Sequence, residues 1–137
     1  MAVSEMSQDS AATVRLQESF AAQKAAFLRD PYPSVEDRRA RIQSVADVLV
    51  ANRMRIREAM SDDFAVHPEL FADMVEVLGR VARAQWALAH LEEWMAPDER
   101  ETDPAMYGTA RAFVRHEPKG VIGNIVPWNF PYDLSMG

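Results

Sequence analysis

The sequence contains no cysteine, which excludes disulfide bonds, thiolate metal sites and a cysteine nucleophile within these 137 residues. Basic residues are outnumbered, since 15 lysines and arginines against 21 aspartates and glutamates leave a formal charge of −6. That charge repels nucleic acid and anionic lipid surfaces. The N-terminus lacks the basic start and apolar block of a secretory signal, and no segment is apolar enough for a membrane span. We therefore expect a cytoplasmic protein without a nucleic-acid partner.

Hydrophobic residues make up 48% of the chain, which is typical of a single globular domain with a modest core. We expect residues 1–12 to be a flexible N-terminus and residues 13–96 to be largely helical. Apolar residues at helical spacing predict a first helix over 13–28, which ends at the proline-rich segment 31–33. The chain is thus expected to open with an amphipathic helix.

Ser34 and Asp37 resemble a capping box in which aspartate replaces the usual glutamate or glutamine, and they predict the start of a second helix. The apolar residues of this helix recur at the spacing of a helix packed on one face: Ile42, Val45, Ala46 and Leu49. A break is expected near Asn52. A short third helix should follow and end before Pro68, with these apolar residues on one face: Ile56, Met60 and Phe64.

A fourth helix is predicted to begin at His67 and Pro68, because histidine can cap it and the missing N–H of proline is harmless at the first helical position. Its apolar residues alternate steps of four and three up to Pro97: Leu70, Met74, Val77, Val81, Ala84, Leu88, Leu91 and Met95. This spacing permits a coiled coil. A second row widens the stripe beyond a coiled-coil seam: Phe71, Val75, Leu78 and Ala82. We favour a long core helix, weakened by about 1 kcal/mol at Gly79, and keep the coiled coil as the alternative.

Strand-like segments follow the helices. Residues 97–110 are acidic and contain two prolines, which is typical of a surface connection. Residues 111–116 and 121–126 have strand-like content, and the turn 117–120 between them predicts a hairpin. The apolar second strand requires buried neighbours that the sequence does not contain. Residues 132–137 should start another helix, and the chain stops without a polar tail, so we expect a truncated piece of a longer protein.

The segment 127–131, Pro-Trp-Asn-Phe-Pro, places two prolines around three side chains directly after the apolar strand. Such a turn can hold the Asn129 amide rigidly. An asparagine NH2 is an uncharged donor, which suits it to stabilising an oxygen that becomes negative in a transition state, by about 3 kcal/mol. The alternative is that Asn129 hydrogen-bonds its own turn and that Trp128 and Phe130 belong to the core. Residue types alone favour this alternative.

Residues 117–131, Glu-Pro-Lys-Gly-Val-Ile-Gly-Asn-Ile-Val-Pro-Trp-Asn-Phe-Pro, resemble the strand-and-turn signature of the aldehyde dehydrogenase superfamily. Residues 59–64, Ala-Met-Ser-Asp-Asp-Phe, and residues 93–95, Glu-Trp-Met followed by Pro97, are similar to its coniferyl aldehyde dehydrogenase branch. The resemblance covers most of the chain beyond residue 14. It implies an α/β fold in which about four helices lead into the first strands of a dinucleotide-binding domain, truncated in this sequence.

The same resemblance implies roles for the motif. Asn129 would donate to the oxyanion formed when a cysteine thiolate attacks an aldehyde, and Phe130 would line the substrate passage. One wall of the NAD or NADP site would be formed by Ile125, Val126, Pro127 and Trp128. Asp133 departs from the family, which commonly continues apolar there, and this leaves the passage open to question.

The implied reaction oxidises an aldehyde, coniferyl or another aromatic one, to the carboxylic acid with a cysteine nucleophile and a glutamate base. Family members carry both groups further along the chain than this sequence extends. We therefore expect the 137 residues to be inactive alone, and the complete protein to be a homo-oligomer.

Other chemistry-bearing residues favour structural interpretations. Gly120 and Gly123 lack the full dinucleotide fingerprint and are predicted to be turn and packing glycines. Trp86 and Trp94 could belong to a ligand site, but core or subunit packing is the favoured interpretation. No metal is expected, because the histidines are too dispersed to form a site: His67, His90 and His116.

A second function class is a short helical interaction protein that pairs with full-length subunits through exposed strands. A stop codon directly after Gly137 would favour this class. An open reading frame that encodes a later cysteine and glutamate would favour a truncated dehydrogenase.

Overall fold

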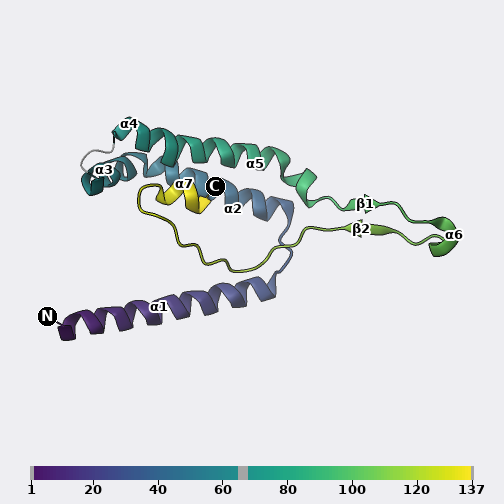
Figure 1. Cartoon of the computed structure of the whole chain (residues 1–137), viewed down its shortest axis with the longest axis horizontal. Coiled ribbons are helices and arrows are strands. Elements are labelled where there is room, and N and C mark those ends of the chain that lie inside the picture. The colour runs from purple at the N-terminus through teal and green to yellow at the C-terminus, as the bar shows by residue number, and fades with distance from the viewer. Residues whose placement is uncertain (1, 65–67, 137) are drawn as a thin grey trace. The chain divides into compact units, whose positions relative to one another are not determined.

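A computed structural model describes residues 2–64 and 68–136 (Figure 1). The chain divides into two compact units, one formed by residues 1–33 and 117–123 and the other by residues 34–116 and 124–137. Among the described residues, no helix is both long and apolar enough to cross a membrane.

The smaller unit consists of helix α1 (Ala2–Arg29) and the segment 117–123. The predicted start of the first helix at residue 13 is wrong, because α1 begins at Ala2 and no glycine or proline interrupts the alanine-rich chain before Pro31. The flexibility expected of residues 1–12 stays a prediction. Gly120 has φ of 99°, and a Cβ there would lie 3.2 Å from Cε1 of Phe27. Its predicted role as a packing glycine is therefore confirmed, whereas the turn predicted at 117–120 is not formed.

The larger unit contains three long helical segments in sequence: α2 (Val35–Ala51), α3 (Arg53–Phe64) and a continuous run made of α4 (Glu69–Ala72), the π-helix η1 (Asp73–Leu78) and α5 (Gly79–Met95). The predicted cap of α2 is confirmed, since the N–H of Asp37 donates to Ser34 Oγ at 3.0 Å. The break at Asn52 is also confirmed. Pro68 precedes α4 as its N-cap rather than occupying the first helical position, and His67 lies outside the described residues.

The core of this unit lies where α2 and α3 meet the long run, and its buried apolar residues come from all three segments: Leu49, Ile56, Met60, Ala72 and Val77. The long run is a core helix, but its predicted apolar stripe is wrong in part, because Leu70 and Met74 are 70% and 58% exposed. Phe71 and Leu78 of the second row are exposed as well. The i→i+5 hydrogen bonds of η1 widen the turn and shift which residues face inward. Two carboxylates, Asp73 and Glu76, are buried instead.

Asp73 is paired with Arg53 of α3, whose guanidinium donates to both carboxylate oxygens. These hydrogen bonds hold the pKa of Asp73 below its usual value, although burial opposes the shift. A carboxylate with a lowered folded-state pKa contributes stability above its unfolded pKa of about 4, and that stability is lost as the pH falls through the folded pKa. The pair therefore links α3 to η1 in a pH-dependent way.

We expect Asp73→Asn to lower Tm by several degrees at pH 7, because it removes a charged partner from Arg53. The difference from the unsubstituted chain should shrink as the pH falls below about 4, where Asp73 itself becomes protonated. Thermal unfolding followed by circular dichroism across this pH range checks it, with the exposed Asp63→Asn as the control. A Tm difference that is constant with pH would contradict the ion-pair explanation.

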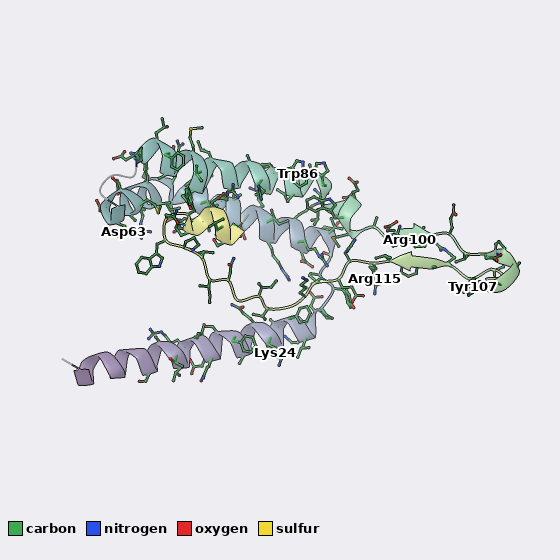
Figure 2. All side chains as sticks on the ribbon, in the orientation of Figure 1. Lys24, Asp63, Trp86, Arg100, Tyr107 and Arg115 are labelled. Atoms are coloured by element: carbon green, nitrogen blue, oxygen red, sulfur yellow. The ribbon has the colours of Figure 1, made fainter. Side chains whose placement is uncertain are left out.

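Beyond α5, the chain forms a hairpin with a short helix at its tip (Figure 1). Strand β1 (Asp98–Arg100) pairs antiparallel with β2 (Ala112–Val114), and α6 (Pro104–Tyr107) lies between them, capped by Asp103. Figure 2 labels Arg100 and Tyr107 on this arm. The surface connection expected over 97–110 is largely exposed, but it contains a strand and a helix.

The predicted hairpin between 111–116 and 121–126 is wrong, because β2 pairs with β1 instead. Residues 121–126 form no strand and are not buried as a strand would be: Ile125 is 101% exposed. An apolar strand needs partners on its edges, and the described residues offer none to this segment. The short helix α7 (Pro131–Met136) follows, one residue before the predicted start.

Candidate functional site

The Pro-Trp-Asn-Phe-Pro motif forms a tight turn that leads directly into α7. Residues 128–130 make the turn, and Pro131 is the first residue of α7, where its fixed φ suits a helix. The N–H of Leu134 donates to the Phe130 carbonyl at 3.1 Å and closes the first helical turn. Asn129 therefore lies within this turn, two residues before the start of α7.

A buried carboxylate holds the start of α7. Glu76, in the π-helix η1, is 0% exposed, and its Oε2 accepts hydrogen bonds from the N–H groups of Tyr132 at 2.7 Å and Asp133 at 3.0 Å. Because Pro131 has no N–H, these are the first two backbone donors of the helix. The side chain of Glu76 thus acts as a cap supplied from 56 residues away in the chain.

Arg80, one turn further along the same helical run, supplies a second anchor. Its guanidinium forms an ion pair with the Asp133 carboxylate at 2.5 Å and donates to the Asp133 carbonyl at 3.3 Å. Both side chains are largely buried, so this pair is screened less than a surface pair. At the other end of α7, the amide of Asn124 donates to the Ser135 carbonyl at 3.0 Å. The charge of Asp133, an open question in the sequence, is therefore neutralised inside the protein.

The motif side chains have different surroundings. Phe130 packs edge-on against Phe71 of α4, with ring centroids 6.1 Å apart. Trp128 is 85% exposed, so its alternative placement in the core is wrong. Within the described part of the chain, the Asn129 side chain is exposed and makes no hydrogen bond, which leaves its NH2 available. The remaining residues proposed for the cofactor wall are also open to solvent in whole or part: Ile125, Val126 and Pro127.

Comparison with known proteins identifies the family to which this chain belongs. The sequence model of the aldehyde dehydrogenase family matches residues 3–137. The chain belongs to the aldehyde dehydrogenase family. The resemblance carried by residues 117–131 is therefore confirmed.

Individual relatives name the branch. The "Probable coniferyl aldehyde dehydrogenase" of Caulobacter vibrioides is 39% identical over 116 residues, which cover 83% of this chain and 24% of that protein. The coniferyl aldehyde dehydrogenase of a Pseudomonas species is 33% identical over 114 residues, or 83% of this chain and 23% of that protein. Aldehyde dehydrogenase family 3 member B1 of Mus musculus is 32% identical over 114 residues, or 82% of this chain and 24% of that protein. The chain spans about a quarter of the length of these curated relatives.

Two residues of this candidate site were not predicted from the sequence: Glu76 and Arg80. Each lies on the predicted long helix among apolar residues, and charged residues there were not expected to face the core. A usable signal was present, because 73, 76 and 80 follow helical spacing and place two carboxylates and a guanidinium on one face. Such a charged face predicts partners on another element, although it does not name them.

The tryptophans and histidines considered in the sequence analysis are not part of the motif. Trp86, labelled on α5 in Figure 2, forms a three-ring cluster with His90 and Trp94. The ring centroid of Trp86 lies 4.5 Å from that of His90 and 5.0 Å from that of Trp94, and the last two centroids are 5.9 Å apart. Core packing is wrong for both tryptophans, since they are exposed, and subunit packing stays a prediction. In the described residues, no group of histidine, aspartate and glutamate side chains is placed to hold a metal ion.

Proposed function

We propose that this chain is the N-terminal part of an aldehyde dehydrogenase that oxidises coniferyl aldehyde, or another aromatic aldehyde, to the carboxylic acid with NAD+ or NADP+. Relatives named coniferyl aldehyde dehydrogenases support the choice of aldehyde, and their greater length supports a longer protein. The observation that carries the proposal is the Pro-Trp-Asn-Phe-Pro turn, which presents an Asn129 amide without a competing partner in the described residues.

Asn129 serves as the oxyanion donor in this proposal. When a cysteine thiolate from the rest of the protein attacks the aldehyde carbon, the carbonyl oxygen gains negative charge. The Nδ2–H of Asn129 donates to that oxygen, and a neutral donor does so without changing its own protonation state. One such donor, held in place beforehand, lowers the barrier by about 3 kcal/mol.

The residues before Asn129 fit a dinucleotide. Exposed apolar side chains such as Ile125 and Trp128 can cover a planar ring and exclude water from one of its faces. Val126 and Pro127 would complete this wall. When bound, the cofactor supplies the hydride acceptor. Phe130 would line the aldehyde passage, where its packing on Phe71 fixes the ring direction.

The segment 121–126 is proposed to become a strand of the dinucleotide-binding domain in the complete protein. Its apolar side chains support this, since Ile122 and Ile125 are both exposed and would be buried by neighbouring strands.

The complete protein is proposed to be a cytoplasmic homo-oligomer.

The test is to express the complete protein and follow NADH or NADPH formation with coniferyl aldehyde and a short aliphatic aldehyde. We expect turnover with at least one cofactor and a higher kcat/KM for the aromatic substrate. Absence of turnover with either aldehyde and either cofactor would contradict the proposal. The coding DNA beyond Gly137 gives an independent check, because a stop codon there would favour the interaction protein that pairs with full-length subunits.

A further inference from the structure

We propose that Glu76 is the positioning residue for Asn129, a role that rests on the proposed oxyanion function and goes beyond it. The carboxylate does not touch the reacting atoms. It fixes the two N–H groups that open α7, and α7 begins two residues after Asn129. Glu76 thereby sets where the Asn129 amide lies.

The buried state of Glu76 points to a dedicated role. A carboxylate with 0% exposure loses its hydration, and such a group persists only where donors replace the lost water. The N–H groups of Tyr132 and Asp133 are those donors, and both go to Oε2. Oε1 is buried and has no hydrogen-bond partner among the described residues. The side chain is therefore placed for its contact with α7 rather than for its own solvation.

The backbone around Glu76 supports this interpretation. Residues 73–78 form a π-helix, a rare local geometry that occurs often at functional sites. On this segment Asp73 pairs with Arg53 of α3 while Glu76 faces α7, so one short stretch connects both elements. Arg80 adds its ion pair with Asp133 one turn later.

The connection from Glu76 to Asn129 is short and stiff. Between Asn129 and the clamped N–H of Tyr132 lie only Phe130, whose ring packs on Phe71, and Pro131, whose ring fixes φ. Little torsional freedom is left to absorb a displacement of α7. A shift of about 1 Å in a catalytic group can lower a rate by about 10²-fold. Loss of the two hydrogen bonds from α7 to Glu76 should therefore lower kcat.

The experiment compares Glu76→Asp and Glu76→Gln in the complete enzyme. Aspartate keeps the charge but is one methylene too short, whereas glutamine keeps the reach and an oxygen that can accept both N–H groups. We expect Glu76→Asp to lower kcat by about tenfold or more while KM for the cofactor changes less than about threefold. Glu76→Gln should retain most of kcat. The reverse order would overturn the positioning role, because it would show that charge rather than reach matters.

Two further measurements separate positioning from general stability. Asp73→Asn is the matched control, since it removes a buried carboxylate of the same π-helix whose hydrogen bonds come from Arg53 of α3, and it should leave kcat within about twofold. Hydrogen exchange of the peptide spanning 130–136 should accelerate in Glu76→Asp and stay unchanged in the control. Equal acceleration in both variants would overturn the proposal.

A double-mutant cycle decides whether Glu76 acts through Asn129. On an Asn129→Ala background, Glu76→Asp should change kcat by less than about threefold, because the group it positions is gone. A full tenfold loss on that background would overturn the proposal. If Asn129→Ala alone leaves kcat unchanged, the proposed function fails. If Asn129→Ala lowers kcat and Glu76→Asp does not, only the positioning role fails.

Discussion

Replacing Asn129 by alanine in the complete enzyme is expected to lower kcat by about 10²-fold or more. The amide is the oxyanion donor in the proposed reaction. The methyl group of alanine cannot donate a hydrogen bond to the oxygen that becomes negative. KM for the aldehyde should change little, because the interaction forms fully only in the transition state. Steady-state kinetics with saturating cofactor measures both quantities.

The fold should not change in this variant, since Asn129 is exposed and makes no hydrogen bond within the described residues. Circular dichroism and Tm check that expectation. Asn52→Ala is the matched control, because it removes the same amide from the end of α2, where it donates to the Val48 carbonyl. Its kcat should stay within about twofold of the parent enzyme. An unchanged kcat in Asn129→Ala would refute the oxyanion role.

The 137-residue chain alone is expected to form no NADH or NADPH from any aldehyde. It contains no cysteine, so the thiolate that begins the proposed reaction has no source within it. The Asn129 amide stabilises an oxyanion only after a nucleophile has attacked, and a donor alone cannot start the reaction.

Purified chain and complete protein, assayed at equal molar concentration, test this expectation. The complete protein is the positive control for substrate and cofactor. Aldehyde-dependent cofactor reduction by the isolated chain that persists through repeated purification would contradict it. Such activity would also show that a nucleophile other than cysteine operates within these residues.

Local chemistry explains the parts of the fold that could be predicted from sequence. Ser34 and Asp37 predict the start of α2 because a cap involves only neighbouring residues. Pro127 and Pro131 predict the turn and the start of α7 because proline restricts φ wherever it occurs. Gly120 has a positive φ, which glycine adopts readily because it has no Cβ.

The errors occur where distant residues decide the structure. β1 pairs with β2 through the exposed, charged residues 98–100, which show no apolar alternation to distinguish them from a loop. Residues 121–126 have the composition of a buried strand, but no strand among the described residues pairs with them. The composition of a segment indicates which secondary structure it can form, but strand pairing also depends on which other segments lie beside it.

The candidate site also contains one residue that local sequence predicts and one whose partners are distant in the chain. Asn129 could be found because its motif is contiguous and its chemistry is that of one side chain. The partners of Glu76 could not be found, because they are the N–H groups of Tyr132 and Asp133, more than 50 residues later. Helical spacing predicts an apolar inner face for the long run, and the π-helix places a carboxylate there instead. A buried charge becomes explicable only once its partners are known.

The most direct measurement is a crystal structure of the complete enzyme with an aldehyde bound covalently to its catalytic cysteine. We expect Asn129 Nδ2 to lie about 2.7–3.1 Å from the former carbonyl oxygen of that adduct. Glu76 should still accept hydrogen bonds from Tyr132 and Asp133. An adduct oxygen more than about 4 Å from Asn129 Nδ2, with hydrogen bonds from other donors instead, would contradict the oxyanion role of Asn129.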